Sequence, residues 1–131
     1  MIATFALIGT LLSALWLVFV AGLMAVAPHR ALAALRAAGS TWTLQIGEHV
    51  LRGLAGLCLI GVADGSRAPT VFLVAGSFIL ATSVLILLLP RRWHHAYAVA
   101  WAERISPLAM RCLAPFSLAG GLALLWAMRA G

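Results

Sequence analysis

The 131-residue sequence has few charged residues and no lysine at all. Charged residues make up 9% of the chain, whereas a soluble globular domain carries roughly 25%. Hydrophobic residues make up 64%, which is more than a small soluble core could enclose, because a short chain buries only part of its surface. The composition therefore excludes an ordinary soluble domain and predicts an integral membrane protein.

Acidic residues are scarcer still, with three against nine arginines, and the formal net charge is +6. A basic chain can bind nucleic acid, but these arginines are scattered between apolar runs and form no basic face. We therefore expect no nucleic-acid partner. Arginines beside membrane helices contact lipids, so we expect membrane lipids, including anionic ones, as partners.

Several chemical motifs are also missing. The two cysteines, Cys58 and Cys112, lie inside apolar runs without a CxxC motif or the spacing of metal ligands. No GxSxG motif supports a nucleophilic hydrolase. We predict no catalytic activity and no metal centre.

Long apolar runs are what the sequence has in abundance. Four of them cover residues 2–27, 42–63, 69–89 and 108–128, and a membrane-crossing helix needs about 20 such residues. The first run contains no charged residue and is longer than the apolar core of a secretory signal, so we predict a retained helix there. The sequence predicts one all-α domain over residues 1–131, a polytopic membrane protein with four transmembrane helices.

The arginines are distributed unevenly among the connections between these runs. The two longer connections and the start of the fourth run contain Arg30, Arg36, Arg91, Arg92, Arg104 and Arg111. The opposite side has Arg67 and Arg129. The positive-inside rule places the arginine-rich connections in the cytoplasm. We predict a multi-pass protein of a bacterial-type inner membrane, with both termini on the periplasmic side.

Prolines, glycines and serines mark the ends of the predicted helices. Ser40 is the predicted N-cap of the second span, and Asp64-Gly65-Ser66 predicts a tight turn that makes the second and third spans an antiparallel hairpin. The strings Ala27-Pro28-His29-Arg30 and Leu89-Pro90-Arg91-Arg92 each end an apolar run. They indicate two helix–linker–helix halves that run in the same direction.

The connection after the third run has an aromatic stripe. Trp93, Tyr97 and Trp101 recur every four residues, on one face of a helix, with basic neighbours. This pattern predicts an interfacial amphipathic segment between the third and fourth spans, and the alternative is that the third span continues as one long helix. The residues predicted to lie at the lipid headgroups are Arg91, Arg92, Trp93, His94, His95, Tyr97, Trp101 and Arg104.

The second run contains the most informative polar residues. A charge at mid-membrane costs about 2.5–3.5 kcal/mol on insertion scales, so such groups pair, line a wet cavity or face other helices. We predict a polar intramembrane site formed by Gln45, Glu48, His49 and Arg52. Glu48 and Arg52 have the spacing of a helical ion pair, so the site is either a structural ion pair or a binding site for a proton, cation or other ligand.

Small residues in the second and fourth runs predict where helices approach one another closely. The residues predicted to pack helices are Gly53, Gly56, Gly61, Gly120 and Gly121. With short connections and no soluble domain, this favours a non-catalytic accessory or scaffold subunit, bound to other membrane subunits or to copies of itself.

Two other functions stay open. The first is a small oligomeric transporter or channel that uses Glu48, His49 and Arg52. The second is a redox subunit with haem, whose axial ligands must face each other at matched depth. Because His49 is the one histidine inside a predicted span, we expect no haem and no other cofactor.

Overall fold

A computed structural model describes residues 1–128 of the chain, and Arg129 lies outside this range. Within residues 1–128 the protein contains six α-helices, one short 3-10 helix and no strand. The elements are α1 (Ile2–Val26), α2 (Pro28–Ala37), α3 (Trp42–Val62), η1 (Ala63–Gly65), α4 (Pro69–Leu88), α5 (Arg91–Arg104) and α6 (Pro107–Met128). The prediction of an all-helical chain is confirmed.

Four of these helices, α1, α3, α4 and α6, are long and apolar enough to cross a membrane. Their ends agree with the predicted runs to within one residue. Prolines explain part of this agreement, because three helices begin at Pro28, Pro69 and Pro107. A backbone N–H in the first turn of a helix has no partner within the helix, so proline loses no hydrogen bond there.

Two local predictions differ from the structure. The N-cap of α3 is Thr41 and not Ser40, because the Thr41 hydroxyl accepts a hydrogen bond from the Leu44 N–H at 3.2 Å. The third predicted span does not continue as one long helix. It ends at Leu88, since Pro90 cannot donate to the preceding turn, and α5 begins anew at Arg91.

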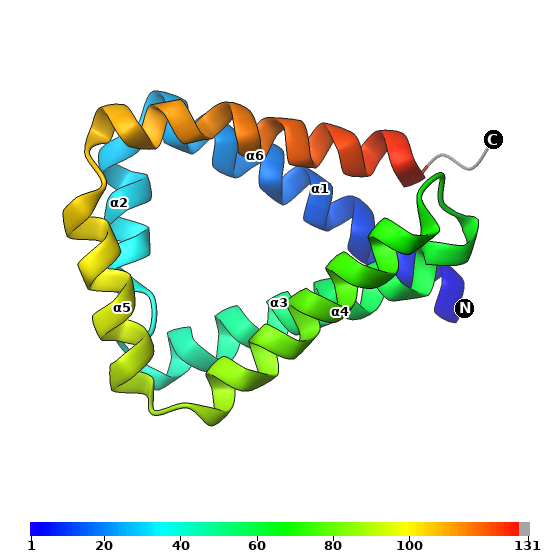
Figure 1. Ribbon diagram of the computed structural model, residues 1–131, viewed down its shortest axis with the longest axis horizontal. Coiled ribbons are helices and arrows are strands. Elements are labelled where there is room, and N and C mark those ends of the chain that lie inside the picture. The colour runs from blue at the N-terminus through cyan, green and yellow to red at the C-terminus, as the bar shows by residue number, and fades with distance from the viewer. Residues whose placement is uncertain (129–131) are drawn as a thin grey trace.

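The helices are arranged as the three sides of a triangle (Figure 1). α1 packs along α6 on one side, α3 packs along α4 on the second, and α2 packs on α5 along the third. The two long pairs converge near the N-terminus, where α1 contacts α3 and η1 joins α3 to α4 as a tight antiparallel hairpin. Both connections rich in arginine, α2 and α5, therefore lie at the same end of the long helices.

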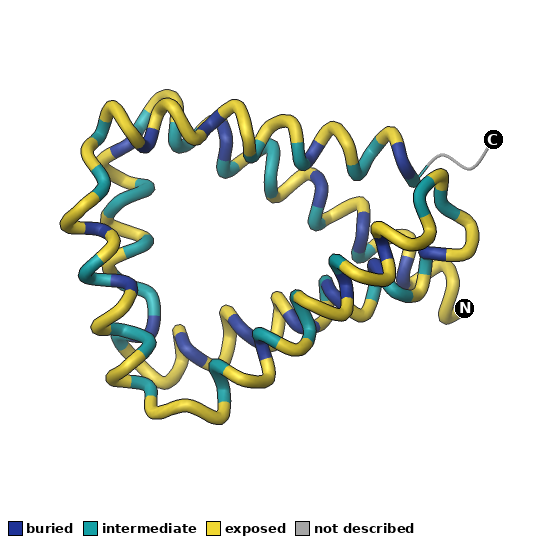
Figure 2. Tube along the Cα trace, in the orientation of Figure 1, coloured by how far each residue is buried: buried dark blue, intermediate teal, exposed yellow. Residues whose placement is uncertain are grey.

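Buried residues form narrow lines where helices touch, and most of the surface of the long helices is exposed (Figure 2). The largest apolar cluster lies where the hairpin meets α6 and contains Leu59, Ala63, Phe72 and Ala127. The largest fully buried side chains are polar: His49, Gln45, Thr10 and Ser83. Many large apolar side chains are exposed along the four long helices, which is the reverse of a soluble surface.

The buried positions repeat between the two halves of the chain. When α1 and α4 are aligned on the prolines that follow them, three buried positions of α1 coincide with all three of α4. The matched pairs are Thr10 with Phe72, Ala14 with Gly76, and Ala21 with Ser83. The halves α1–α2–α3 and α4–α5–α6 thus present the same faces to one another.

A similar match relates α3 to α6 when both are counted from their first residues. Gly56 of α3 matches Gly121 of α6, and each lies against the backbone of the neighbouring long helix. A Cβ on Gly56 would lie 2.7 Å from the Gly76 carbonyl oxygen, and one on Gly121 would lie 2.8 Å from the Ala14 carbonyl oxygen. Both pairs are therefore closed by backbone contact at equivalent positions.

The other glycines singled out in the sequence pack less closely or at another contact. A Cβ on Gly61 would lie 2.9 Å from the Ala6 Cβ, at the junction of α1 and α3. Cβ atoms on Gly53 and Gly120 would make ordinary contacts, at 3.7 Å from leucine side chains. Gly76, which the sequence did not single out, is as tightly packed as Gly56.

A Gly56→Ala variant is expected to lose about 1–3 kcal/mol of stability, because its methyl group would press on the backbone of α4. Thermal unfolding in mild detergent measures this. Gly47→Ala is the matched control, since a Cβ there would meet nothing within 4 Å and alanine favours a helix. Equal melting temperatures for the two variants would contradict the close contact between α3 and α4.

Candidate functional site

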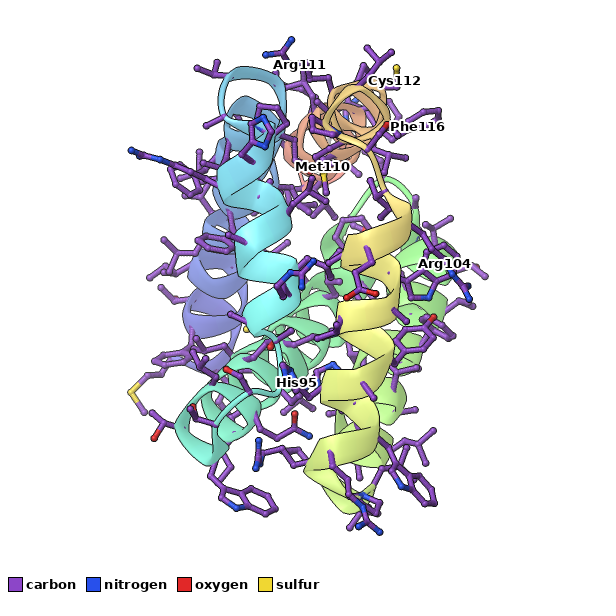
Figure 3. The ribbon with its side chains drawn as sticks, turned by 90° about the vertical axis from the view of Figure 1, so that its left-hand side faces the viewer. His95, Arg104, Met110, Arg111, Cys112 and Phe116 are labelled. Atoms are coloured by element: carbon purple, nitrogen blue, oxygen red, sulfur yellow. The ribbon has the colours of Figure 1, made fainter. Side chains whose placement is uncertain are left out.

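The first turn of α5 holds the linker between α2 and α3 in place. Arg91 Nη1 donates to the carbonyl oxygens of Gly39 at 2.8 Å and Ser40 at 2.7 Å, and His95 Nδ1 donates to the Ala38 carbonyl oxygen at 3.0 Å. These carbonyls follow the end of α2, where a helix leaves backbone acceptors unpaired. In Figure 3, His95 lies between α5 and the linker, whereas Arg104 projects away from the helices.

Gly39 allows this close approach of the linker to α5. Its φ is +71°, a conformation that residues with a side chain rarely adopt. A Cβ at this position would also lie 2.8 Å from His94 Nδ1. The linker thus forms one wall around the His94 ring.

Gln45, on the first turn of α3, connects α4 to α5 through its side-chain amide. Its Nε2 donates to the Ile86 carbonyl oxygen at 3.2 Å, and its Oε1 lies 2.7 Å from His94 Nδ1. The Ile86 carbonyl is available because its partner four residues later would be Pro90, which has no N–H. With Nε2 directed to that carbonyl, Oε1 must accept, so His94 Nδ1 carries the proton.

The tautomer of His94 follows from this relay. A neutral imidazole has one N–H and one nitrogen with a free lone pair. Because Nδ1 donates to Gln45, the lone pair of His94 is on Nε2. Gln45 therefore sets both the orientation of this ring and the atom that it can offer to a ligand.

His49, one turn after Gln45, is buried but has no hydrogen-bond partner among residues 1–128. The residue is 1% exposed, and neither Nδ1 nor Nε2 bonds to another group in that range. Its ring meets His94 edge to face, with the centroids 4.8 Å apart and the planes at 69°. An unsatisfied buried polar group costs about 1–3 kcal/mol of stability, so a fully buried histidine without a hydrogen bond is unusual and calls for an explanation.

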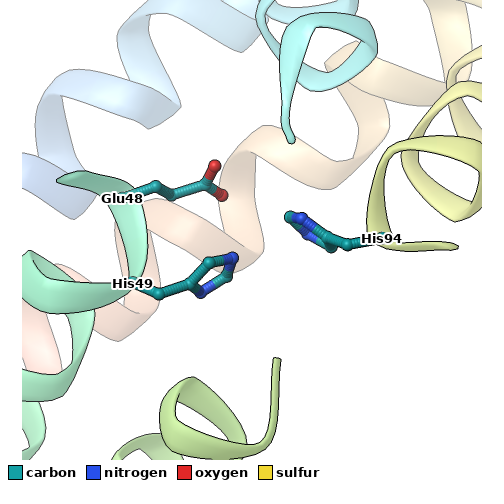
Figure 4. A group of neighbouring side chains, drawn as sticks. All are labelled: Glu48, His49 and His94. Carbon is teal, nitrogen blue, oxygen red and sulfur yellow. The ribbon is translucent and has the colours of Figure 1, made fainter. Parts of the chain in front are cut away.

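Glu48, His49 and His94 converge on one point (Figure 4). One potential ligand atom from each of the three side chains lies within 4.8 Å of the others. His49 is buried, His94 is half-buried, and Glu48 is exposed, so its carboxylate is free to rotate. We name these three residues the Glu48–His49–His94 cluster.

An open pocket of about 330 Å³ leads to the cluster. Glu48, Arg52 and His94 line it, together with Leu35, Tyr97 and Trp101 from α2 and α5. Arg52 Nη2 donates to the Thr82 hydroxyl on α4 at 3.3 Å. The one ion pair formed within residues 1–128 joins Arg36 to Glu103 at 3.6 Å, so the spacing of Glu48 and Arg52 does not produce an ion pair.

The structure places all four residues of the predicted polar site, Gln45, Glu48, His49 and Arg52, around this pocket or directly behind it. From the sequence, His94 is predicted at the lipid headgroups and not at this site, because no local pattern tells that α5 folds back onto the start of α3. The sequence feature that bears on the position of His94 is the preceding Pro90. It separates α5 from α4 and leaves the Ile86 carbonyl available to Gln45.

The residues predicted to lie at lipid headgroups divide into two groups. Arg91, His94 and His95 bond to the linker or to Gln45. The others are exposed, namely Arg92, Trp93, Tyr97, Trp101 and Arg104, and of these Tyr97 and Trp101 also line the pocket. Lipid contact of this second group stays a prediction.

The second half of the chain has no counterpart of this polar site. The positions of α6 that match Gln45 and His49 are occupied by Met110 and Ala114, and both are buried. The matching buried positions of α6 are thus filled by apolar residues, whereas those of α3 are polar.

In comparisons with protein-family models, curated proteins and solved structures, the chain matches none.

Proposed function

We propose that the chain is a four-pass integral membrane protein that binds a small cation in the pocket between α3 and α5, as a small transporter or channel. The observation that carries this proposal is the buried His49 imidazole, which has no hydrogen-bond partner in the described part of the chain, beside a Glu48 carboxylate that forms no ion pair there. A passive scaffold gains no stability from either group, since Ala114 occupies the equivalent of position 49 in α6.

The surface of the long helices supports insertion into a bilayer. Large apolar side chains project from all four of them, including Phe5, Leu51, Phe78 and Phe116. Water would have to solvate this apolar area, whereas hydrocarbon does not, and a helix satisfies its own backbone hydrogen bonds there. The four long helices are therefore proposed as spans, in a bacterial-type inner membrane.

The proposed orientation rests on α2 and α5. Both lie at one end of the long helices and contribute arginines, including Arg30 and Arg92, so the positive-inside rule places this end in the cytoplasm and the termini outside. The exposed rings of Trp93, Tyr97 and Trp101 fit the headgroup layer, and the arginines fit anionic lipids. The pocket then opens near the cytoplasmic surface.

A Glu48→Gln variant tests the proposal in proteoliposomes. Protons and Zn²⁺ are the two probes, each followed with a trapped fluorescent indicator. We expect the wild-type protein to move at least one of them, and Glu48→Gln to reduce this flux by at least about tenfold, because an intramembrane carboxylate is the group that binds a cation.

The matched control is Glu103→Gln, which removes an exposed carboxylate of an ion pair outside the cluster. We expect its flux to equal that of the wild-type protein. Flux no greater than in empty liposomes, or equal flux from Glu48→Gln and wild type, would overturn the proposal.

An accessory subunit is a second candidate function, favoured by the outer surface of α1 and α3. Cβ atoms on Gly22 and Gly47 would meet nothing within 4 Å, so a helix of a partner protein or of another copy could approach closely at these points. Purification in mild detergent separates the candidates, because a lone homo-oligomer would contradict the accessory role.

A further inference from the structure

We infer that the Glu48–His49–His94 cluster binds a divalent first-row transition metal ion, with Zn²⁺ as the best match. This inference rests on the proposed cation-binding function and specifies its ligand. Two imidazoles and one carboxylate are a donor set that zinc sites use, with the fourth position left to water or a substrate. Mg²⁺ and Ca²⁺ prefer oxygen ligands throughout, so the two histidines disfavour them.

The protonation of His94 is already that of a metal ligand. Ligating histidines commonly donate their second ring N–H to a neighbouring acceptor, which fixes the tautomer and the orientation of the ring. Gln45 Oε1 accepts from His94 Nδ1 at 2.7 Å, and Nε2 keeps its lone pair. Gln45 is itself held by the Ile86 carbonyl, so the support extends from α4 through α3 to α5.

A metal ion also accounts for the unpartnered imidazole of His49. Both ring nitrogens are buried without a hydrogen bond, and the ring lies against His94 and beside Glu48. Coordination would give a partner to one of the two buried nitrogens. Ala114 stands at the matching position in α6, where no such cluster forms within the described residues.

The ligand atoms of the cluster must move only a short distance to reach the spacing found around a zinc ion. Ligand atoms about 2.0–2.2 Å from a tetrahedral zinc ion lie about 3.3 Å from one another. The widest spread of the cluster is 4.8 Å, so its largest gap must close by about 1.5 Å. Glu48 is exposed and can move toward the two imidazoles by rotating its side chain.

The surroundings leave the carboxylate and the fourth position accessible. Arg52 is drawn toward Thr82 on α4 and does not pair with Glu48. The pocket of about 330 Å³ reaches Glu48 and His94 from outside, which provides an entry path and room for an exogenous fourth ligand. A haem between the rings is disfavoured, because centroids 4.8 Å apart leave no space for its plane.

Metal titration of the full chain tests the inference. The protein is purified in mild detergent with a tag that does not bind metals, stripped with a chelator, and titrated with Co²⁺ and then Zn²⁺. We expect one Co²⁺ per chain with the visible absorption of a four-coordinate site, and its displacement by Zn²⁺. Glu48→Gln, His49→Leu and His94→Leu should each weaken binding by at least about tenfold.

The controls are His29→Leu and Glu103→Gln, which remove an exposed histidine and an exposed carboxylate outside the cluster and should leave affinity and stoichiometry unchanged. Because Glu48 is exposed, Glu48→Gln should fold even if the His94 variant does not. Binding that survives Glu48→Gln and His49→Leu, or that is lost only in the controls, would overturn the inference.

The outcomes for the two proposals are separable. Proton flux that depends on Glu48, without Zn²⁺ or Co²⁺ binding, would support the proposed transporter and overturn the metal site. Stoichiometric metal binding at the cluster without flux would support the metal site and overturn the transporter.

Discussion

A His49→Leu variant is expected to be more stable than the wild-type protein, by about 1–3 kcal/mol, when both are free of metal. Burying His49 removes two ring nitrogens from water and gives neither a protein partner. Leucine has a similar volume and no polar atom, so it fills the site without that penalty. The equivalent position of α6, which carries Ala114, shows that an apolar residue is compatible with this packing.

Thermal unfolding in mild detergent with a chelator measures the difference. Adding zinc at a thousand times the wild-type Kd should reverse the order, because it stabilises the folded wild-type protein by about 4.1 kcal/mol. The wild-type protein should gain this stability and His49→Leu should not. His95→Leu is the control and should be less stable than wild type, since it loses the bond to the Ala38 carbonyl.

The two conditions separate the possible explanations. A His49→Leu variant that is no more stable than wild type without metal would mean that the imidazole already has a partner. A stability gain without reversal by zinc would leave His49 as an unsatisfied group and contradict its role as a ligand.

The long helices could be predicted from the sequence because their causes are local. Length, hydropathy and the prolines at positions 28, 69, 90 and 107 decide where each helix begins and ends, and all are visible in a few consecutive residues. The polar residues of α3 could be predicted for the same reason, since Glu48 and His49 interrupt an apolar run. An error of one residue arose at the N-cap, where Ser40 and Thr41 are equally suitable and only the path of the linker selects Thr41.

The second half of the candidate site depends on tertiary structure and could not be predicted. His94 is adjacent to aromatic and basic residues that suggest a helix at the membrane surface, and nothing nearby indicates that it reaches Gln45. Its position depends on the packing of α5 against α2 and on the hydrogen bond from Arg91 to the Gly39 carbonyl. It also depends on the Ile86 carbonyl, which accepts from Gln45 because Pro90 has no N–H to donate to it. Each of these contacts joins residues far apart in the chain.

The repeat separates what serves the fold from what serves a ligand. Gly56 and Gly121 occupy equivalent positions and close the two long pairs in the same way, so this feature belongs to the architecture. Gln45 and His49 of α3 correspond in position to Met110 and Ala114 of α6. The two polar residues therefore occur in the first half of the chain alone. Where two halves of a chain pack in the same way, the positions at which one half has polar residues and the other apolar ones are expected to have a function.

Gln45 is a positioning residue by this argument, and a Gln45→Met variant is expected to bind Zn²⁺ about 10–100-fold more weakly. Methionine is the residue at the matching position of α6, but it leaves the Ile86 carbonyl and His94 Nδ1 without their partner, so the variant should fold with a loss of about 1–3 kcal/mol of stability. It cannot accept from His94 Nδ1, so the ring loses both its fixed orientation and its preference for a lone pair on Nε2. Affinity is measured by competition with a chromogenic chelator, and folding by the melting temperature without metal.

A Gln45→Glu variant distinguishes positioning from packing. Its carboxylate can still accept from His94 Nδ1 but cannot donate to the Ile86 carbonyl, so it keeps the bond that orients the ligand and loses the one that anchors Gln45. We expect its Zn²⁺ affinity to exceed that of Gln45→Met even if its melting temperature is lower, because the acceptor decides the tautomer. Equal loss of affinity in both variants, or wild-type affinity in Gln45→Met, would show that the ring of His94 does not depend on Gln45.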